Sequence, residues 1–365
     1  MKDMKIGDLC TYASKSSIKA GEAINNGKYM FFTSGTDENK RYSDYQLDCE
    51  AIIMGTGGNA TLHYYNGKFS TSTDCVVLIP NEYIRCKYLY YFFLYNINVL
   101  ENGFKGAGLK HTNKNYISNI EINNVPNIET QDKIIKALNM VFGIKFYYQQ
   151  QLQKLDELVK SRFIEMFGDP VSNPHGYEKV NLSELADIKI GPFGSLLHKE
   201  DYIEGGHPLL NPSHIIDGKI APDNKFSISN EKYDELSAYQ LHIGDVVMGR
   251  RGEMGRCAVI PDEGYLCGTG SLLIRTKGEV TADYIQKVIS FPSFRKTIDD
   301  MAVGQTMPNL NVPIVSTFQI IIPPIMVQKR FYAFVEQVDK SKFAVQQTLD
   351  KAQELFDSLM QKYFG

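Results

Sequence analysis

Two loops rich in basic residues carry the clearest chemistry in this sequence. Residues 105–115 (Lys-Gly-Ala-Gly-Leu-Lys-His-Thr-Asn-Lys-Asn) hold three lysines and a histidine without a carboxylate. Residues 249–256 place Arg250, Arg251 and Arg256 among three glycines. Lysine pairs with phosphate, glycine lets the backbone approach it closely, and the arginine fork matches O6 and N7 of guanine. Both loops therefore contain the residue types that duplex DNA recognition uses.

Asparagines, hydroxyl residues and histidines near these loops extend the set of candidates. An asparagine amide matches N6 and N7 of adenine. We predict DNA contacts for Thr56, Asn59, Lys105, Lys110, His111, Asn113, Lys114, Ser195, Lys199, Asn211, Ser213, His214, Arg250, Arg251, Arg256 and Asn309. For any one of these residues a solvated surface loop is the more ordinary interpretation. Basic loops at equivalent places in a duplicated chain favour DNA.

The elements that position these loops are marked by a long internal repeat. Residues 126–168 match residues 323–365 with a shift of 197 and no gap, so that Gln131 falls on Gln328. In both copies apolar residues alternate steps of four and three, which is the seam of a heptad repeat. The seam of the first copy is Ile134, Leu138, Val141, Lys145, Tyr148, Leu152, Leu155, Val159, Arg162 and Met166. The seam of the second is Phe331, Val335, Val338, Lys342, Val345, Leu349, Ala352, Phe356, Leu359 and Tyr363. The pattern predicts two long helices, each the only partner of matching length for the other.

One level of this seam is polar in both copies. Lys145 and Lys342 occupy the same heptad position. A polar residue there can fix the register of the pair or leave room for a third element, and the alternative is a lysine that snorkels to solvent. Gly143 lowers the stability of the first helix by roughly 1 kcal/mol relative to alanine.

The repeat divides the chain into two similar halves. A chain of 365 residues suits two or three domains. We predict a first recognition domain at 1–125, a helix at 126–168, a turn-rich linker and second domain at 169–322, and a helix at 323–365. The second domain echoes the first, with 48–55 matching 242–249, 71–79 matching 266–274, and 108–113 matching 305–310. Short strands are expected at 51–54 and 75–79, and an aromatic helix at 87–96.

Composition narrows the class of protein. With 43% hydrophobic and 22% charged residues the chain is typical of a soluble protein, and its longest apolar runs are too short to cross a membrane. The first residues contain no signal-peptide core, so we expect a cytoplasmic protein. Six cysteines without a Cys-x-x-Cys pair indicate reduced, partly buried thiols. The net charge of −3 argues mildly against nucleic-acid binding, although a local basic patch can outweigh it.

The common catalytic motifs do not occur in the sequence. We find no phosphate-binding Gly-x-x-x-x-Gly-Lys-Ser/Thr, no His-Glu-x-x-His, no Gly-x-Ser-x-Gly and no histidine pair at metal spacing. A methyl-donor loop and an Asn/Asp-Pro-Pro-aromatic tetrapeptide are also missing. Two alternatives stay open. One is a metal-dependent DNA endonuclease using Lys199, Glu200 and Asp201, and the other is a coiled-coil scaffold for protein partners.

The duplication resembles a known family. Together with the segments 208–218, 244–256 and 321–328, it is similar to the specificity subunit of type I restriction-modification systems. The resemblance covers essentially the whole chain and is stronger in the second half. In the first half the loop 55–59 (Gly-Thr-Gly-Gly-Asn) lacks the paired arginines, so the base contacts there are not defined by the resemblance.

The resemblance implies an α+β fold with a pseudo-twofold duplication. Two mixed α/β target-recognition domains, joined by two long antiparallel coiled-coil helices, would each read one half of a split double-stranded DNA target. Two modification methyltransferase subunits would dock on the helices and bring S-adenosylmethionine, and a restriction subunit, where one exists, would add ATP and Mg²⁺. This chain would then be non-catalytic, hold no cofactor and stay off membranes. The helix residues assigned to partner contacts are Gln149, Lys154, Glu157, Gln346, Lys351 and Glu354.

Overall fold

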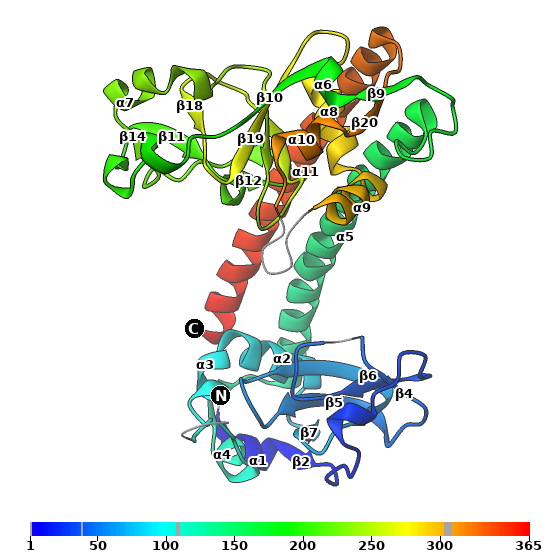
Figure 1. The fold of residues 1–365 in the computed structure, drawn as a ribbon. Coiled ribbons are helices and arrows are strands. Elements are labelled where there is room, and N and C mark those ends of the chain that lie inside the picture. The colour runs from blue at the N-terminus through cyan, green and yellow to red at the C-terminus, as the bar shows by residue number, and fades with distance from the viewer. Residues whose placement is uncertain (1, 38, 107–109, 303–308) are drawn as a thin grey trace. The chain divides into compact units, whose positions relative to one another are not determined.

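The computed structural model describes residues 2–37, 39–106, 110–302 and 309–365. The chain forms two compact units (Figure 1). Unit 1 comprises Met1–Gln151 and Val345–Gly365, and unit 2 comprises Leu152–Ala344. Each of the two long helices is therefore divided between the two units.

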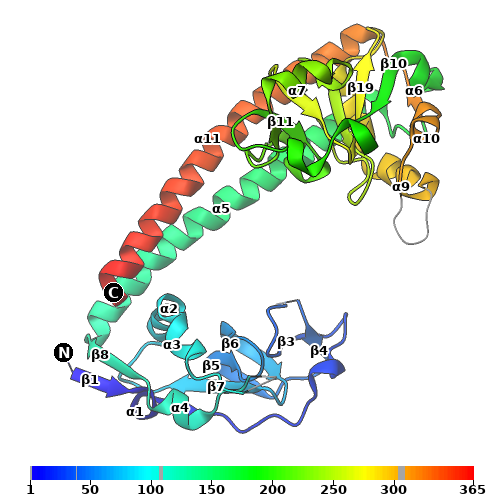
Figure 2. The same cartoon turned by 60° about the vertical axis from the view of Figure 1, so that its left-hand side comes forward.

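Unit 1 is built on a six-stranded sheet. Its order is β2 (Cys10–Tyr12), β7 (Cys75–Pro80), β5 (Leu47–Gly55), β6 (Leu62–Thr71), β3 (Tyr29–Phe32) and β4 (Arg41–Tyr42). The pairs are antiparallel except that β3 runs parallel to β6. Helix α2 (Cys86–Tyr95) covers one face, as Figure 2 shows, and α3 (Ile97–Glu101) follows it.

The central strand β5 is buried on both faces of this sheet. Ile52 and Met54 pack into the core shared with α2, whereas Ala51 and Ile53 pack on the other side with Phe32. Successive side chains of a strand point to opposite faces, so a strand buried on both sides reads as a continuous apolar run. Such a run predicts a strand from the sequence alone. The strands expected at 51–54 and 75–79 are confirmed as parts of β5 and β7, and the helix expected at 87–96 is confirmed as α2, which begins and ends one residue earlier.

Unit 2 contains two four-stranded sheets. The first is antiparallel, with the order β10 (Ala186–Ile190), β19 (Ser271–Thr276), β16 (Val246–Gly249) and β17 (Cys257–Val259). The second has the order β14 (Ser227–Ile228), β11 (His207–Leu210), β18 (Tyr265–Cys267) and β15 (Gln240–Leu241). Helix α8 (Ala282–Ser290) packs against the first sheet and is followed by α9 (Pro292–Met301).

Short elements complete both units. In unit 1 they are β1 (Lys2–Lys5), α1 (Ile6–Leu9), α4 (Lys114–Ser118) and β8 (Glu121–Val125), with β1 paired to β8. In unit 2 they are β9 (Lys179–Asn181), α6 (Leu182–Leu185), β12 (Ile215–Ile216), β13 (Lys219–Ile220), α7 (Asn230–Glu235), α10 (Val312–Ser316) and β20 (Gln319–Ile321), with β9 paired to β20.

The two units repeat the same topology. The strand order β2-β7-β5-β6 corresponds to β10-β19-β16-β17, and β1–β8 corresponds to β9–β20. Gly55 pairs with Cys75 at the end of β5, and Gly249 pairs with Ser271 at the end of β16. This register relates β7 to β19 by a shift of 196 residues. The sequence match of 71–79 with 266–274 implied a shift of one residue less. Backbone pairing gives the correct alignment here because the side chains of the two strands have diverged.

The two long helices follow the predicted repeat closely. Helix α5 (Ile128–Phe167) and helix α11 (Ile325–Phe364) have 40 residues each and are related by the same shift of 197. The Oδ1 of Asn127 accepts a hydrogen bond from the backbone N–H of Thr130 at 2.9 Å, which closes the start of α5. Gly168 ends it with a φ of +75°, a conformation that glycine adopts without steric cost.

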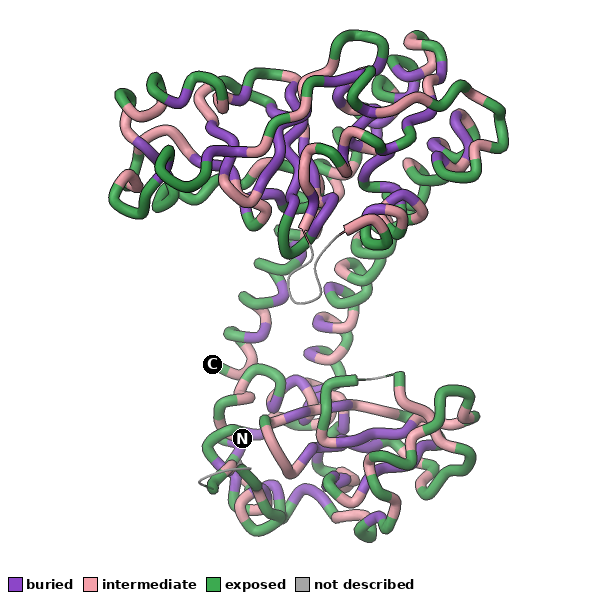
Figure 3. The backbone as a smooth tube through the Cα atoms, viewed as in Figure 1, coloured by how far each residue is buried: buried purple, intermediate pink, exposed green. Residues whose placement is uncertain are grey.

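The heptad seams lie along the inner sides of these helices. Every predicted seam residue is buried or half-buried, and exposed positions recur between them (Figure 3). In unit 2, Asp156 pairs with Lys342 while Phe163 meets Phe331 at 5.5 Å between ring centroids. From the first contact to the second, the residue number increases along α5 and decreases along α11, so the two helices run antiparallel. In unit 1 the start of α5 and the end of α11 share one core.

The two seam lysines have partners on the opposite helix. In unit 1 the Nζ of Lys145 lies 4.7 Å from the ring centroid of Phe356. In unit 2 the Nζ of Lys342 forms an ion pair with Asp156. Each lysine thus contacts a specific residue across its helix pair, as a register-fixing residue does.

Candidate nucleic-acid interface

The second basic loop leaves β16 after Gly249 and returns into β17. Arg250, its first residue, is buried, at 6% exposure. Its Nε donates to the carbonyl oxygen of Thr269 at 3.1 Å, and its Nη1 donates to Oδ1 of Asn309 at 2.8 Å. Burial, together with the nearby charge of Arg251, lowers the pKa of Arg250. Arg250 therefore anchors the loop to the segment that precedes α10.

The other two arginines of this loop lie closer to solvent. Arg251 is exposed and forms an isolated β-bridge with Asn309. Arg256 is half-buried, forms an ion pair with Glu253, and donates from Nη1 to the carbonyl oxygen of Pro212 at 3.5 Å. Of the three, Arg251 is the arginine presented at the surface.

The first basic loop takes part in the corresponding junction of unit 1, but from its other side. Residues 105–115 lead into α4, whereas 249–256 follow β16, so the prediction that the two basic loops lie at equivalent places is wrong, and the equivalent feature is the junction itself. Gly57 forms an isolated β-bridge with His111, as Arg251 does with Asn309. The backbone N–H of Thr112 donates to the carbonyl oxygen of Thr56 at 3.0 Å. In unit 2 the N–H of Leu310 donates to the carbonyl oxygen of Arg250 at 2.9 Å, in the corresponding place. In both units the loop after the central strand thus joins the segment before the short helix.

The junction brings several predicted contacts of unit 1 together. The carbonyl oxygen of Lys110 accepts from the N–H of Gly58 at 3.0 Å, and Lys105 and His111 exchange backbone hydrogen bonds, also at 3.0 Å. Lys105, Lys110 and His111 are all exposed. Residues 107–109, within the predicted loop 105–115, lie outside the described residues.

Some candidates have structural roles at these loops. The Oδ1 of Asn113 caps α4 by accepting from the N–H of Tyr116 at 3.0 Å, and Asn311 caps α10 in the same way at 2.9 Å. The hydroxyl of Thr56 donates to the carbonyl oxygen of Asp74 at 3.0 Å. The ammonium of Lys114 lies 5.1 Å from the ring centroid of Tyr12.

The remaining candidates, apart from Asn59 in the loop after β5, lie on other loops. The buried His214 holds the turn after β11, with its Nδ1 at 2.9 Å from the carbonyl oxygen of Leu209 and 3.3 Å from the N–H of Asn211. Exposed side chains are found at Asn59, Ser195, Lys199 and Ser213. Within the described residues, Ser195 and Lys199 make no hydrogen bond or ion pair with either loop junction, so these two candidates lie at the surface but are not joined to the junctions.

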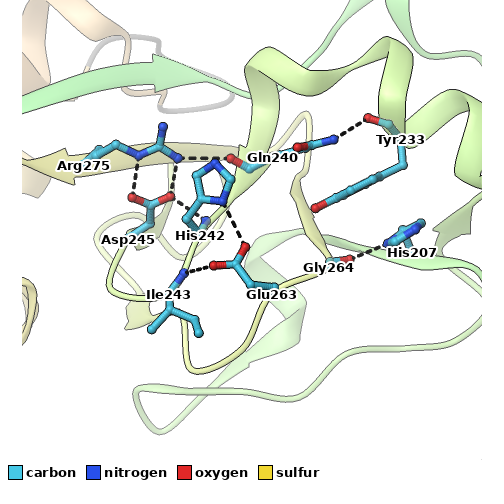
Figure 4. A network of polar contacts seen from close by, with 9 residues as sticks. All are labelled: His207, Tyr233, Gln240, His242, Ile243, Asp245, Glu263, Gly264 and Arg275. Atoms are coloured by element: carbon cyan, nitrogen blue, oxygen red, sulfur yellow. Dashed lines mark hydrogen bonds and ion pairs between the residues drawn. The ribbon is translucent and has the colours of Figure 1, made fainter.

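A network of polar contacts supports the start of β16, the strand that leads into the second loop (Figure 4). Arg275 donates from Nε and Nη2 to the two carboxylate oxygens of the buried Asp245 at 2.8 and 2.6 Å. The same carboxylate accepts from the N–H of His242 at 2.8 Å. A second carboxylate, that of Glu263, lies beside His242. The hydrogen bond from the His242 side chain lowers the pKa of Glu263, and Glu263 also accepts a hydrogen bond from the N–H of Ile243 at 3.0 Å. The sequence analysis included 242–249 and 244–256 but assigned no role to these side chains, because a buried carboxylate is recognisable only when its partner on a distant strand is known.

The predicted partner-binding residues of the helices lie at the surface. Gln149, Lys154, Glu157, Gln346, Lys351 and Glu354 are all exposed. The structure adds an apolar set on α5 that the sequence analysis missed: Met140, Phe142, Ile144, Phe146 and Tyr147, each at least 40% exposed. The signal was present, because all five fall outside the heptad seam yet are large and apolar.

The alternative nuclease site does not gather acidic residues around a metal position. Asp201 accepts from the N–H of His198 at 2.7 Å and lies 3.9 Å from Lys232. Across the described ranges, no group of three histidine, cysteine, aspartate or glutamate side chains could hold a metal ion. Over the same residues, no helix combines the length and apolarity needed to cross a membrane.

Comparison with known proteins connects this architecture to one class. A family model described as the type I restriction modification DNA specificity domain matches residues 1–156 and again 174–354. The chain is 21% identical over 310 residues to the MjaVIII type I restriction enzyme specificity subunit of Methanocaldococcus jannaschii, covering 80% of this chain and 72% of that protein. It is 24% identical over 350 residues to a putative type I specificity subunit of Mycoplasma pneumoniae, covering 92% and 88%.

Solved structures share the fold. The S subunit of a type I restriction-modification system from M. genitalium aligns with a TM-score of 0.66 at 15% identity, over 100% of this chain and 96% of that chain. A chain from a study of complex assembly and conformational transition of the type I R-M system aligns with a TM-score of 0.58 at 16% identity, over 100% and 97%.

A duplicated α/β unit with a paired long helix in each copy is the architecture of a DNA specificity protein with two recognition domains. The chain belongs to the type I restriction modification DNA specificity domain family, since the model matches most of its length. The predicted family and fold class are thereby confirmed.

Proposed function

We propose that this chain is the non-catalytic DNA-reading subunit of a type I restriction-modification complex. Each unit presents one basic loop junction to one half of a bipartite duplex target. Two modification methyltransferase subunits would carry S-adenosylmethionine, a restriction subunit would carry ATP and Mg²⁺, and this chain would hold no cofactor. The complex would act in the cytoplasm.

The equivalence of the two loop junctions is the observation that carries this proposal. The bridges Gly57–His111 and Arg251–Asn309 occupy the same place in the two copies. Backbone geometry is shared while the side chains differ, with glycine and histidine in one copy and arginine and asparagine in the other. Two domains that recognise different half-sites need this combination. A shared backbone geometry lets both domains dock on DNA in the same way, and different side chains let them recognise different bases.

The exposed apolar set on α5 supports docking of protein partners on the helices. Met140, Ile144 and Tyr147 line a groove in unit 1 with Leu355 of α11, and Gly143 is also part of its lining. A Cβ added at Gly143 would meet nothing within 4 Å, so packing inside this chain does not require a glycine there. An exposed apolar patch of this kind is typical of a protein interface. We further propose a first recognition domain at 1–125, a linker and second recognition domain at 169–322, and the helices at 126–168 and 323–365 as spacers.

The test is to purify the chain alone and measure two activities. We expect salt-sensitive binding to duplex DNA and no incorporation of tritiated methyl groups until the modification subunit is added. Metal-dependent cleavage by the chain alone would favour the endonuclease alternative. Neither DNA binding nor cleavage, with partner binding retained, would favour the scaffold.

A further inference from the structure

A cavity of about 240 Å³ opens in unit 2 where α5, α11 and the turn between α8 and α9 meet. Its floor is aromatic. The ring of Phe163 stacks on Phe291 at 5.1 Å between centroids and meets the edge of Phe331 at 5.5 Å. All three rings are buried, so their positions are fixed by packing with the core of unit 2.

The rim of this cavity is charged. Lys342 and Asp156 pair with each other. The remaining charged lining residues are Lys160, Lys287 and Asp339. Within the part of the chain that the structure describes, neither Lys160 nor Lys287 has a hydrogen-bond or ion-pair partner. Among the lining residues three lysines stand against two aspartates, so the lining itself carries one positive charge in excess. Asp283, four residues before Lys287 on α8, is a further nearby carboxylate outside the lining.

Lys287 is the lysine most strongly affected by this setting. Burial lowers the pKa of its ammonium, and the nearby carboxylates of Asp339 and, more weakly, Asp283 act in the opposite direction. A cation that has lost hydration without gaining a direct partner is stabilised by any anion that enters the site. The cavity therefore combines an apolar surface with two ammonium groups that have no direct hydrogen-bond or ion-pair partner among the described residues.

Unit 1 provides an internal comparison. Helix α2 begins at Cys86 and α8 at Ala282, so Tyr91 corresponds to Lys287, and the helix repeat makes Phe356 correspond to Val159. In unit 1 the ring of Tyr91 packs on Phe356 at 6.2 Å, and its hydroxyl donates to Oδ1 of Asn139 at 2.8 Å. Two aromatic rings there take the places of a valine and a lysine. The charged cavity is thus a property of unit 2 and not of the repeated fold.

We propose that this cavity is a binding site for a small organic carboxylate with an apolar body. The carboxylate would pair with Lys287 and Lys160, and the apolar part would lie on the ring floor. At roughly 30 Å³ for each water, the cavity has the volume of about eight waters, which suits a molecule the size of an arylacetic acid. The site is separate from the loop junctions, and the inference does not depend on DNA recognition.

Occupancy would also stabilise unit 2. The ligand would touch α5, α11 and the α8–α9 turn at once, and a ligand that binds the folded state raises the unfolding temperature with its concentration. Thermal unfolding therefore gives a second readout that is independent of any complex activity.

The experiment is a fluorine NMR titration of the full chain with 4-fluorophenylacetate. We expect saturable binding at one site and a rise in unfolding temperature. The neutral analogue 4-fluorophenylacetamide should bind less tightly, and Lys287→Met should weaken the carboxylate by about tenfold or more, because one charge-assisted hydrogen bond is lost. Val159→Phe, which introduces the unit 1 residue, should abolish binding by filling the cavity.

The matched control is Lys87→Met, the same substitution on the corresponding helix of unit 1, which should leave binding unchanged. Far-ultraviolet circular dichroism checks that each variant is folded. The proposal is overturned if the wild-type chain shows no saturable binding at millimolar probe, if the amide binds as tightly as the carboxylate, or if folded Lys287→Met binds as well as wild type.

Discussion

Gln131 and Gln328 make the same three hydrogen bonds in the two units. The Oε1 of Gln131 accepts from the N–H of Arg85 at 2.7 Å, and its Nε2 donates to the carbonyl oxygens of Pro126 and Tyr83 at 2.8 and 3.1 Å. The Oε1 of Gln328 accepts from the N–H of Thr281 at 2.9 Å. Its Nε2 donates to Pro323 and Glu279 at 2.8 and 3.5 Å. Each glutamine thus ties the start of a long helix to the segment that leads into α2 or α8.

Replacing either glutamine should destabilise mainly its own unit. Gln131→Met keeps the side-chain size but removes all three hydrogen bonds, which costs about 1–3 kcal/mol. Both glutamines are at most 1% exposed, so each substitution acts on a buried side chain. Hydrogen exchange should show faster exchange around residues 83–95 in Gln131→Met, and around residues 279–290 in Gln328→Met.

The control for this pair is Gln150→Met, since Gln150 is exposed on α5. It should leave exchange in both units unchanged. Equal protection in Gln131→Met and wild type would show that the glutamine is not a structural clamp.

The helix repeat shows how far the sequence could predict this fold. Side chains such as Leu138 and Phe356 repeat at heptad spacing because they face one fixed partner, so the helices, their pairing and the duplication were all visible. The domains around these helices were less predictable from the sequence. In β7 and β19 backbone pairing preserves the geometry while the residues change, which is why the sequence alignment there was off by one position.

The recognition loops show what the sequence could not predict. Arg250 and Arg251 are adjacent and chemically identical, yet one is buried against Thr269 and Asn309 and the other is exposed. That difference depends on a segment about 60 residues further along the chain, which no local pattern reveals. The assignment of all candidate residues to DNA contacts stays a prediction.

The two arginines should therefore respond differently to substitution. Arg250→Met should lower the free energy of unfolding of unit 2 by about 2–3 kcal/mol, because it leaves buried carbonyl oxygens unpaired. Arg251→Met should change stability by less than about 0.5 kcal/mol, as is usual at exposed positions. Urea denaturation of both variants measures the difference, and an equal loss of stability in the two would contradict the structural role of Arg250.

The cysteines should resist alkylation in the folded chain. Burial raises the pKa of Cys10 and of Cys267 to about 12 and that of Cys75 and of Cys257 to about 11, and it also raises the pKa of Cys86. A raised pKa lowers the fraction of reactive thiolate at neutral pH. Cys49 is half-buried, so we expect it to react first with iodoacetamide. Peptide mass spectrometry measures the order in which the cysteines are alkylated. Early labelling of Cys257 in the native protein would contradict its burial in the core of unit 2.

The paired helices are predicted to set the gap between the two half-sites. Removing seven residues around Gln149 and the matching seven around Gln346 keeps the heptad seam. At 1.5 Å per residue each deletion shortens a helix by about 10 Å, or about three base pairs. Sequencing of the modified sites should show the same half-sites with a shorter gap. An unchanged gap with activity retained would show that another element sets the spacing.

The most direct test of the two-reader account is to map methylated adenines on DNA from cells that produce this chain with its modification subunit. For the wild-type chain we predict a bipartite motif with two defined half-sites. Arg251→Ala should relax one position of one half-site, with a loss of about 1–3 kcal/mol if its guanidinium reads a guanine. The other half-site should be unchanged. Relaxation of both half-sites together, or a single uninterrupted motif in the wild type, would contradict the assignment of one half-site to each unit.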